Sequence, residues 1–355
     1  MSRTWLKWMP AVAVPAVIVA GVLAVPLQAG AAVDLPDKTP QEVLELAAGS
    51  TVDTFSGTIE QTSELGLPEI PSTGDAATAE FADALDLLTG SRTVRVYQNG
   101  ADQSRVQVQD TMSERNLIRN GSDVWLYDSA DNTAVYTTLP ADAAPGAGAE
   151  KAGASYTPSE LAQTFLDEVT PSTDVTLAGN TQVAGRTAYE LVLTPDSADT
   201  LVGSVSIAVD SGTGLPLRVQ VAAREATDPA ISVAYTSLSL EAPPADLFAF
   251  TPPAGATVSE ETLPTKDDAG HPEADRSGVT VVGTGWDAVV SMPAGEDAAA
   301  LADLTASPLY SQLTDAVDGG RALSTTLVSV LITDDGRVFA GSVPVERLLA
   351  AATQE

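Results

Sequence analysis

The chain contains no cysteine and only one histidine among its 355 residues. The absence of cysteine excludes disulfides and thiolate chemistry, and a single histidine excludes metal sites built from several histidines. His271 lies between Gly270 and Pro272 in a polar stretch, where no predicted element would hold it beside a nucleophile. A serine hydrolase, which needs such a base, is therefore not expected.

Basic residues are also scarce, because Lys and Arg number 17 against 48 Asp and Glu, for a formal net charge of −31. This balance argues against binding nucleic acid or an anionic lipid surface through a basic patch. Aromatic residues make up only 5% of the chain. Many short runs of β-branched residues, separated by Gly and Pro, favour a β-rich fold.

Motifs that would indicate catalysis are missing. No G-x-S-x-G, phosphate-binding loop or dinucleotide fingerprint occurs between a predicted strand and helix. The densest oxygen-rich clusters lie at 128–132, 210–214 and 334–336, all at predicted hairpin turns, where Asp, Asn and Gly suit the backbone. None has the spacing of a calcium loop. A hydrolase or a calcium site built from the plentiful carboxylates is the alternative, but the sequence gives no pair of acids expected to converge in a cleft. The sequence therefore predicts no catalytic residue, metal or cofactor, and a protein that is not an enzyme.

Residues 1–31 have the pattern of an export signal. Arg3 and Lys7 precede an apolar stretch over 10–27, and Ala29-Gly-Ala31 fits a cleavage site. An uncleaved membrane anchor is the alternative, because the apolar stretch is long enough to span a bilayer. Either way, the rest of the chain is expected outside the cytoplasm.

Residues 186–258 carry the clearest pattern, because apolar and polar residues alternate there with period two. This is typical of antiparallel strands with one buried and one solvent-exposed face. Glycines within 210–214 suit a hairpin turn. A break in parity after Tyr235 predicts a β-bulge near Thr236 and Ser237.

Together with the strands of 186–258, the rest of the first domain gives eleven predicted strands and two main helices, in the order helix, six strands, helix, five strands. Each helix begins with a capping box, Thr39 to Glu42 in the first and Thr157 to Glu160 in the second. The other predicted strands span 52–62, 92–98, 104–110, 114–119, 123–128, 133–138 and 173–183.

The segment 66–90 is a long insertion between two predicted strands. An apolar stripe on a helix over 79–88 makes it a candidate lid over a cavity mouth, with permanent packing on the core as the alternative. The candidate lid residues are Leu67, Phe81, Leu85 and Leu88.

A polar stretch over 261–277 predicts a linker between a first domain over 32–260 and a small α+β domain over 278–355. In the small domain we expect a strand at 279–282, Trp286 as a core anchor and a helix at 298–304. A hairpin of 323–333 with 338–342 and a closing helix at 344–353 complete it.

Eleven strands tend to curl into a partial or full barrel, which can enclose an apolar ligand. The predicted fold class is therefore α+β and mostly β, an unclosed half-barrel lidded by helices. A membrane-spanning barrel is disfavoured by the helices, the polar strand faces and the odd strand count. Trp125 and Tyr127 share one strand face, where core packing is favoured over ligand contact.

The chain resembles the LolA-like carriers, whose fold relatives include the mycobacterial LppX and LprG proteins and the RseB/MucB regulators. The resemblance covers 33–259, although the lipid-attachment cysteine of the mycobacterial relatives is missing and residues 278–355 have no matched counterpart. The segments that carry the resemblance are 35–40, 55–57, 66–68, 124–129, 183–191, 210–217 and 248–255.

The resemblance implies a carrier that holds acyl chains of a lipid or lipoprotein in an apolar half-barrel, as an extracytoplasmic monomer. The alternative is an RseB-like sensor that contacts a membrane-bound envelope protein, in particular an anti-sigma factor. The candidate cavity-lining residues are Phe55, Ile59, Trp125, Tyr127, Tyr189, Leu191, Leu193, Val205, Ile207, Val219 and Val221.

Overall fold

A computed structural model describes residues 35–67, 90–109, 113–139, 157–167, 172–224, 226–260, 280–293, 305 and 308–354. The predicted signal over 1–31, the linker over 261–277, the helix over 298–304 and most of the 66–90 insertion lie outside these ranges. Of the candidate lid residues only Leu67, which is half-buried, is described.

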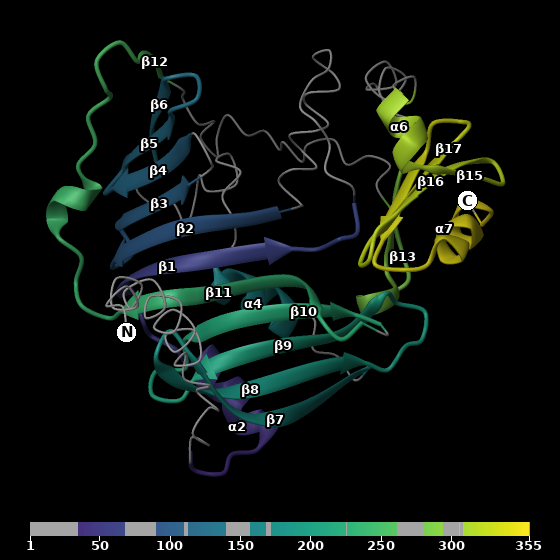
Figure 1. Cartoon of the computed structure of the whole chain (residues 1–355), viewed down its shortest axis with the longest axis horizontal. Helices are drawn as coiled ribbons and strands as arrows, with labels where there is room; N and C mark the ends of the chain where they lie inside the picture. Colours follow the sequence, from purple (N-terminus) through teal and green to yellow (C-terminus); the bar gives the residue numbers. More distant parts are fainter. Residues whose placement is uncertain are drawn as a thin grey trace, which may run out of the picture.

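A single open sheet of twelve strands dominates the structure (Figure 1). Its order is β12-β6-β5-β4-β3-β2-β1-β11-β10-β9-β8-β7, so that two antiparallel meanders meet where β1 pairs with β11. The strands are β1 Thr54–Ser63, β2 Gly90–Asn99, β3 Gln103–Gln109, β4 Glu114–Asn120, β5 Asp123–Asp128, β6 Thr133–Thr138, β7 Thr173–Val183, β8 Arg186–Pro195, β9 Val202–Asp210, β10 Pro216–Ala223, β11 Pro229–Ser239 and β12 Thr257–Glu260.

The eleven strands predicted from the sequence are all present, and the unclosed half-barrel is confirmed. The twelfth strand, β12, is an addition that pairs in parallel with β6. Tight turns separate β2 from β3 and β4 from β5, where Gly100 and Gly121 have φ values of 68° and 67°. The predicted bulge is also present, because Thr58 pairs with Ser237 while Ile59 pairs with Tyr235 and leaves Thr236 unpaired.

Two helices cover one face of the β7–β11 half of this sheet (Figure 1). Helix α2 is Pro40–Ala48 and helix α4 is Pro158–Asp167. We call the covered face the inner face; Leu191, Ile207 and Val219 are cross-strand neighbours on it. The buried side chains Val43 and Ala162, from the two helices, complete this hydrophobic core.

A second sheet of six strands, ordered β13-β14-β18-β17-β16-β15, is formed by the C-terminal part of the chain. Its core includes Leu331 and Phe339, with Leu348 from the closing helix α7. The elements are β13 Thr280–Val282, β14 Val289–Met292, α6 Pro308–Leu313, β15 Asp315–Val317, β16 Gly320–Ser324, β17 Ser329–Thr333, β18 Val338–Gly341 and α7 Val345–Ala352, with short 3-10 turns at Gly285–Asp287 and, before β12, at Ala245–Phe248.

The prediction of one continuous strand over 323–333 is wrong, because β16 ends at Ser324 and β17 begins at Ser329. The loop between them leaves the small sheet and packs against the large one. Leu327 is buried in the inner-face core, and the backbone N–H of Thr326 donates to the carbonyl oxygen of Leu65 at 2.9 Å.

Trp286 does not anchor the core of the small sheet, contrary to expectation. Its ring stacks on Phe165 of α4, with ring centroids 6.1 Å apart, and its Nε1 donates to Thr173 Oγ1 at 2.9 Å. Trp286 therefore packs the C-terminal part of the chain against α4 and hydrogen-bonds it to the large sheet.

Candidate functional site

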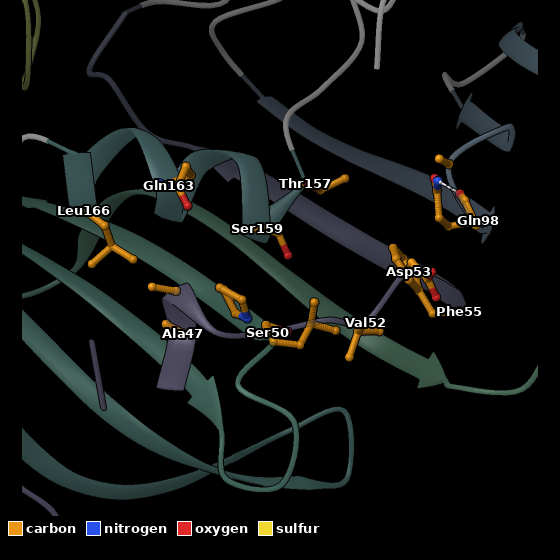
Figure 2. Close-up of a pocket in the computed structure, with 15 residues that line it drawn as sticks. Ala47, Ser50, Val52, Asp53, Phe55, Gln98, Thr157, Ser159, Gln163 and Leu166 are labelled. Atoms are coloured by element: carbon orange, nitrogen blue, oxygen red, sulfur yellow. Dashed lines mark hydrogen bonds between the residues drawn. The ribbon is translucent and has the colours of Figure 1, made fainter. Parts of the chain in front are cut away.

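A cleft of about 430 Å³ opens between α2, α4 and one end of β1. In Figure 2, Ser159 and Leu166 of α4 lie opposite Ala47 and Ser50. We call this space the helix cleft. Its lining residues are Ala47, Ala48, Ser50, Val52, Asp53, Phe55, Gln98, Gly100, Ala101, Thr157, Ser159, Gln163, Leu166, Leu215 and Pro216.

Both helices that form the cleft begin at a capping box. In α2 the backbone N–H and the hydroxyl of Thr39 donate to Glu42 Oε2 at 2.7 and 2.8 Å. Hydrogen bonds from the Thr39 backbone and side chain lower the pKa of Glu42. In α4, Thr157 donates in the same way to Glu160, at 2.8 Å for both atoms. The caps hold the first turn of each helix, and Thr157 of the α4 cap also lines the cleft.

The turn between β9 and β10 supplies the floor at Leu215 and Pro216. Gly214 has a φ of 75°, and a Cβ at this position would lie 2.1 Å from the carbonyl oxygen of Leu46 in α2. Only glycine therefore allows α2 to approach the turn this closely.

Asp210 fixes the start of the same turn. Arg186 Nε and Nη2 donate to its two carboxylate oxygens at 2.9 Å each, and the Thr213 backbone N–H donates at 2.8 Å. Burial raises the pKa of Asp210, but the hydrogen bonds from Arg186 and Thr213 and the Arg186 charge outweigh burial and hold that pKa below its usual range. These contacts occupy both oxygens of the carboxylate and hold the turn in place.

Most of the predicted lining residues do lie together on the inner face. The register aligns Leu193, Val205 and Val221 across three strands, and Leu191, Ile207 and Val219 beside them. All six are at most 4% exposed, because α2 and α4 pack directly on them. They form the packed layer under the helices, and of the predicted lining residues only Phe55 reaches the helix cleft itself.

Ile59 and Tyr189 belong to the same inner face and are also buried. The hydroxyl of Tyr189 donates to the carbonyl oxygen of Pro36 at 3.0 Å, which ties the segment before α2 to β8. Tyr235, opposite Ile59, packs edge-on against Phe55 with ring centroids 6.2 Å apart. Burial, with a smaller contribution from Glu160, raises the pKa of Tyr235, so its hydroxyl stays protonated.

Trp125 and Tyr127 lie on the opposite face of the sheet. The pairing from β1 to β5 places Val96 and Leu126 on the inner face with Ile59, whereas Trp125 and Tyr127 alternate with Leu126 and point to the other side. Phe250 covers both rings, with centroids 5.5 and 5.6 Å away. These two residues pack under the chain segment before β12, away from the helix cleft.

The polar residues of the cleft were missed by sequence reasoning. Ser50, Asp53 and Gln98 come from loops and strand ends, and Thr157 and Gln163 come from α4 and its cap. Only the capping boxes and Phe55 pointed to this region, because α2 and α4 are more than a hundred residues apart in the chain and meet only in the folded protein.

The chemistry of the cleft is that of a binding site. Apolar walls from Val52, Phe55 and Leu166 face a few hydroxyl and amide groups and the carboxylate of Asp53, a mixture typical of small-molecule pockets. Ser50 Oγ is buried and has no hydrogen-bond partner among the described residues. Among all residues that the structure describes, no group of three or more His, Cys, Asp or Glu is placed to hold a metal ion.

Comparison with known proteins agrees with this architecture. Residues 85–261 match the family model described as the MucB/RseB N-terminal domain. No curated protein matches the sequence. Within the described ranges, no helix has the length and apolar character needed to cross a membrane.

Several solved structures are similar to this chain at low identity. The Pseudomonas aeruginosa MucA/MucB complex contains a chain that is 17% identical, with 88% of this chain and 95% of that chain covered and a TM-score of 0.41. The lipoprotein LppX of Mycobacterium tuberculosis is 11% identical, with 56% and 90% covered and a TM-score of 0.26. An uncharacterized conserved protein of Thermus thermophilus is 15% identical, with 62% and 98% covered and a TM-score of 0.34.

The open antiparallel sheet, with helices on its inner face, defines a class of helix-lidded half-barrel proteins. With the family-model match, it places the chain in the superfamily of LolA-like proteins that also contains LppX and the MucB/RseB proteins.

Proposed function

We propose that the protein is an extracytoplasmic carrier that binds the acyl chain of a lipid or lipoprotein in the helix cleft. The observation that supports this proposal is a cleft of about 430 Å³, with an apolar floor and a polar mouth, between two helices that lie on an apolar sheet face. Its volume falls within the range of small-molecule sites. Export through residues 1–31 is part of the same proposal.

Apolar burial would supply most of the binding free energy. Each methylene that leaves water contributes about 0.8 kcal/mol. Burial of about eight methylenes would therefore give about 6 kcal/mol before the cost of ordering the chain and the cleft. At the mouth, the exposed side chain of Gln163 would face the polar end of the ligand. This division suits an amphiphile and requires neither cofactor nor catalytic residue, so we propose that the protein is not an enzyme.

Titration of the full chain with a fluorescent fatty acid tests the proposal. Ala48 is exposed at the end of α2 and lines the cleft, so Ala48→Trp fills the mouth without disturbing the core. Gln41→Trp adds the same ring to an exposed position of α2 outside the lining and is the matched control. We expect saturable binding that A48W weakens by about tenfold or more and Q41W leaves unchanged. Equal binding by both variants would rule out the helix cleft as the site.

A second candidate function is that of an envelope sensor that contacts a membrane-bound partner. The family-model match and the attachment of the C-terminal part through Trp286 favour it. In this version, residues 32–260 form the ligand-binding domain and residues 278–355 a second domain that offers a surface to the partner. Pull-down with the exterior domain of a membrane protein encoded by a neighbouring gene would detect such a contact. If the protein acts alone as a monomeric carrier, the pull-down would recover no partner.

A further inference from the structure

A second cavity, of about 460 Å³, lies where the large and small sheets meet. We call it the junction cavity. Its floor comes from the ends of β9, β10 and β11, its walls include the stacked rings of Phe165 and Trp286, and its rim includes Val281 of β13 and Val328. None of its lining residues belongs to the helix cleft.

Helix α4 separates the two cavities. Ser159, Gln163 and Leu166 face the helix cleft, whereas Thr164 and Phe165 face the junction cavity. The two sets of side chains leave the helix on different sides, as the helical period requires. A ligand in one cavity therefore does not fill the other.

The lining of the junction cavity is uncharged, although the chain carries 48 acidic residues. Val202, Val221 and Leu327 are at most 5% exposed at its floor. The hydroxyl of Thr164 already donates to the carbonyl oxygen of Glu160 at 3.1 Å. Among the described lining residues, no side chain holds a buried polar atom without a partner. The cavity offers a ligand apolar contact and aromatic faces, without charge pairing.

The rim extends this apolar surface into solvent. Val281 is 61% exposed and Val328 is 36% exposed, and they are two of the four large hydrophobic residues that are exposed in the described part of the chain. A buried floor and an open rim suit a ligand with a long hydrocarbon chain. The far end of such a ligand would pass the rim and keep its polar group in water.

We propose that the junction cavity is a second binding site, for the hydrocarbon chain of a fatty acid or lipid, with Trp286 in direct contact with the chain. The site is independent of the helix cleft. The proposal rests on the uncharged lining, the stacked rings of Phe165 and Trp286, and the exposed valines Val281 and Val328 of the rim.

Fluorescence quenching of the full chain by dibromostearic acid tests this site, because bromine quenches indole emission only at contact distance. Trp286→Phe identifies the signal that comes from the junction cavity. Thr164→Trp would fill the cavity, but it adds a further indole to the four of the chain and would contribute emission of its own, so Thr164→Phe is the blocking variant. Val281→Asp places a charge on the rim, and its matched control is Val258→Asp, at a valine that is 54% exposed on β12.

We expect quenching that disappears in W286F, weakens about tenfold in T164F and V281D, and is unchanged in V258D and in A48F, which fills the helix cleft without adding an indole. Quenching that persists in W286F, or that V281D and V258D reduce equally, overturns the second site. Loss of the Trp286 signal in A48F would also overturn it, because the two sites would then not be independent. Failure of the helix cleft alone would leave the Trp286 signal intact, so the two proposals fail separately.

Discussion

The ion pair between Arg186 and Asp210 gives the sharpest prediction for stability. Asp210 is 2% exposed and accepts four hydrogen bonds, two from Arg186 and two from Thr213. Asp210→Asn removes the charge and turns an amide N–H group toward a guanidinium that can only donate. Breaking a buried pair costs about 3–5 kcal/mol. Because the Arg186 side chain is 29% exposed and water can hydrate it, we expect a cost of about 2–3 kcal/mol.

Urea unfolding at pH 7 measures this cost, with Glu190→Gln as the control. The Glu190–Arg218 pair also joins two strands, but both side chains keep about a fifth of their exposure and one hydrogen bond of 2.7 Å connects them. Its loss should cost about 1 kcal/mol or less. A D210N variant that loses no more stability than E190Q would refute the role assigned to Asp210.

The pH dependence has a definite sign. Because the folded pKa of Asp210 is lowered, its carboxylate stabilises the fold fully above the unfolded value of about 3.9. This stabilisation is lost as the pH falls through the lowered folded pKa. The stability gap between wild type and D210N should therefore be constant from about pH 7 to pH 5 and narrow on further acidification. A gap that stays constant at lower pH would contradict this linkage.

Three further substitutions test a close contact within the sheet, the geometry of one turn and the cap of α2. Gly57→Ala places a Cβ 2.7 Å from the Tyr235 ring and should cost about 1–3 kcal/mol in urea unfolding, whereas Gly212→Ala, with its nearest neighbour at 3.6 Å, should be nearly neutral; equal effects would show that the ring can move away. Ala184 has a φ of 51° in the turn from β7 to β8, so Ala184→Asn should stabilise the fold by about 0.5–1 kcal/mol and raise the midpoint of thermal unfolding, and a lower midpoint would contradict the turn geometry. Thr39→Ala removes the cap of α2 and should cost about 1 kcal/mol, measured by chemical unfolding, with a neutral result counting against the capping box.

The strands could be predicted from sequence because period-two alternation and glycine turns act locally. The prediction for 123–128 matches β5 residue for residue, and the parity break after Tyr235 located the bulge. The capping boxes placed the starts of α2 and α4 for the same reason, since their hydrogen bonds span only three residues.

The remaining features depend on contacts between distant residues. Alternation shows that Trp125 and Tyr127 share a face, but which face they share is set by pairing through β1 to β5. The split at Ser324 arises because Leu327 leaves its own sheet for the core of the other. Both cavities form where α4 meets segments far from it in the chain, and no local pattern encodes such meetings.

Native mass spectrometry of the purified full chain, followed by organic extraction, tests the binding of an acyl chain most directly. We predict a bound species with the mass of a fatty acid or lipid, which Ala48→Trp reduces and Gln41→Trp retains. A chain that carries no such species, and that takes up no fatty acid when it is supplied, would contradict the proposal that the helix cleft binds acyl chains.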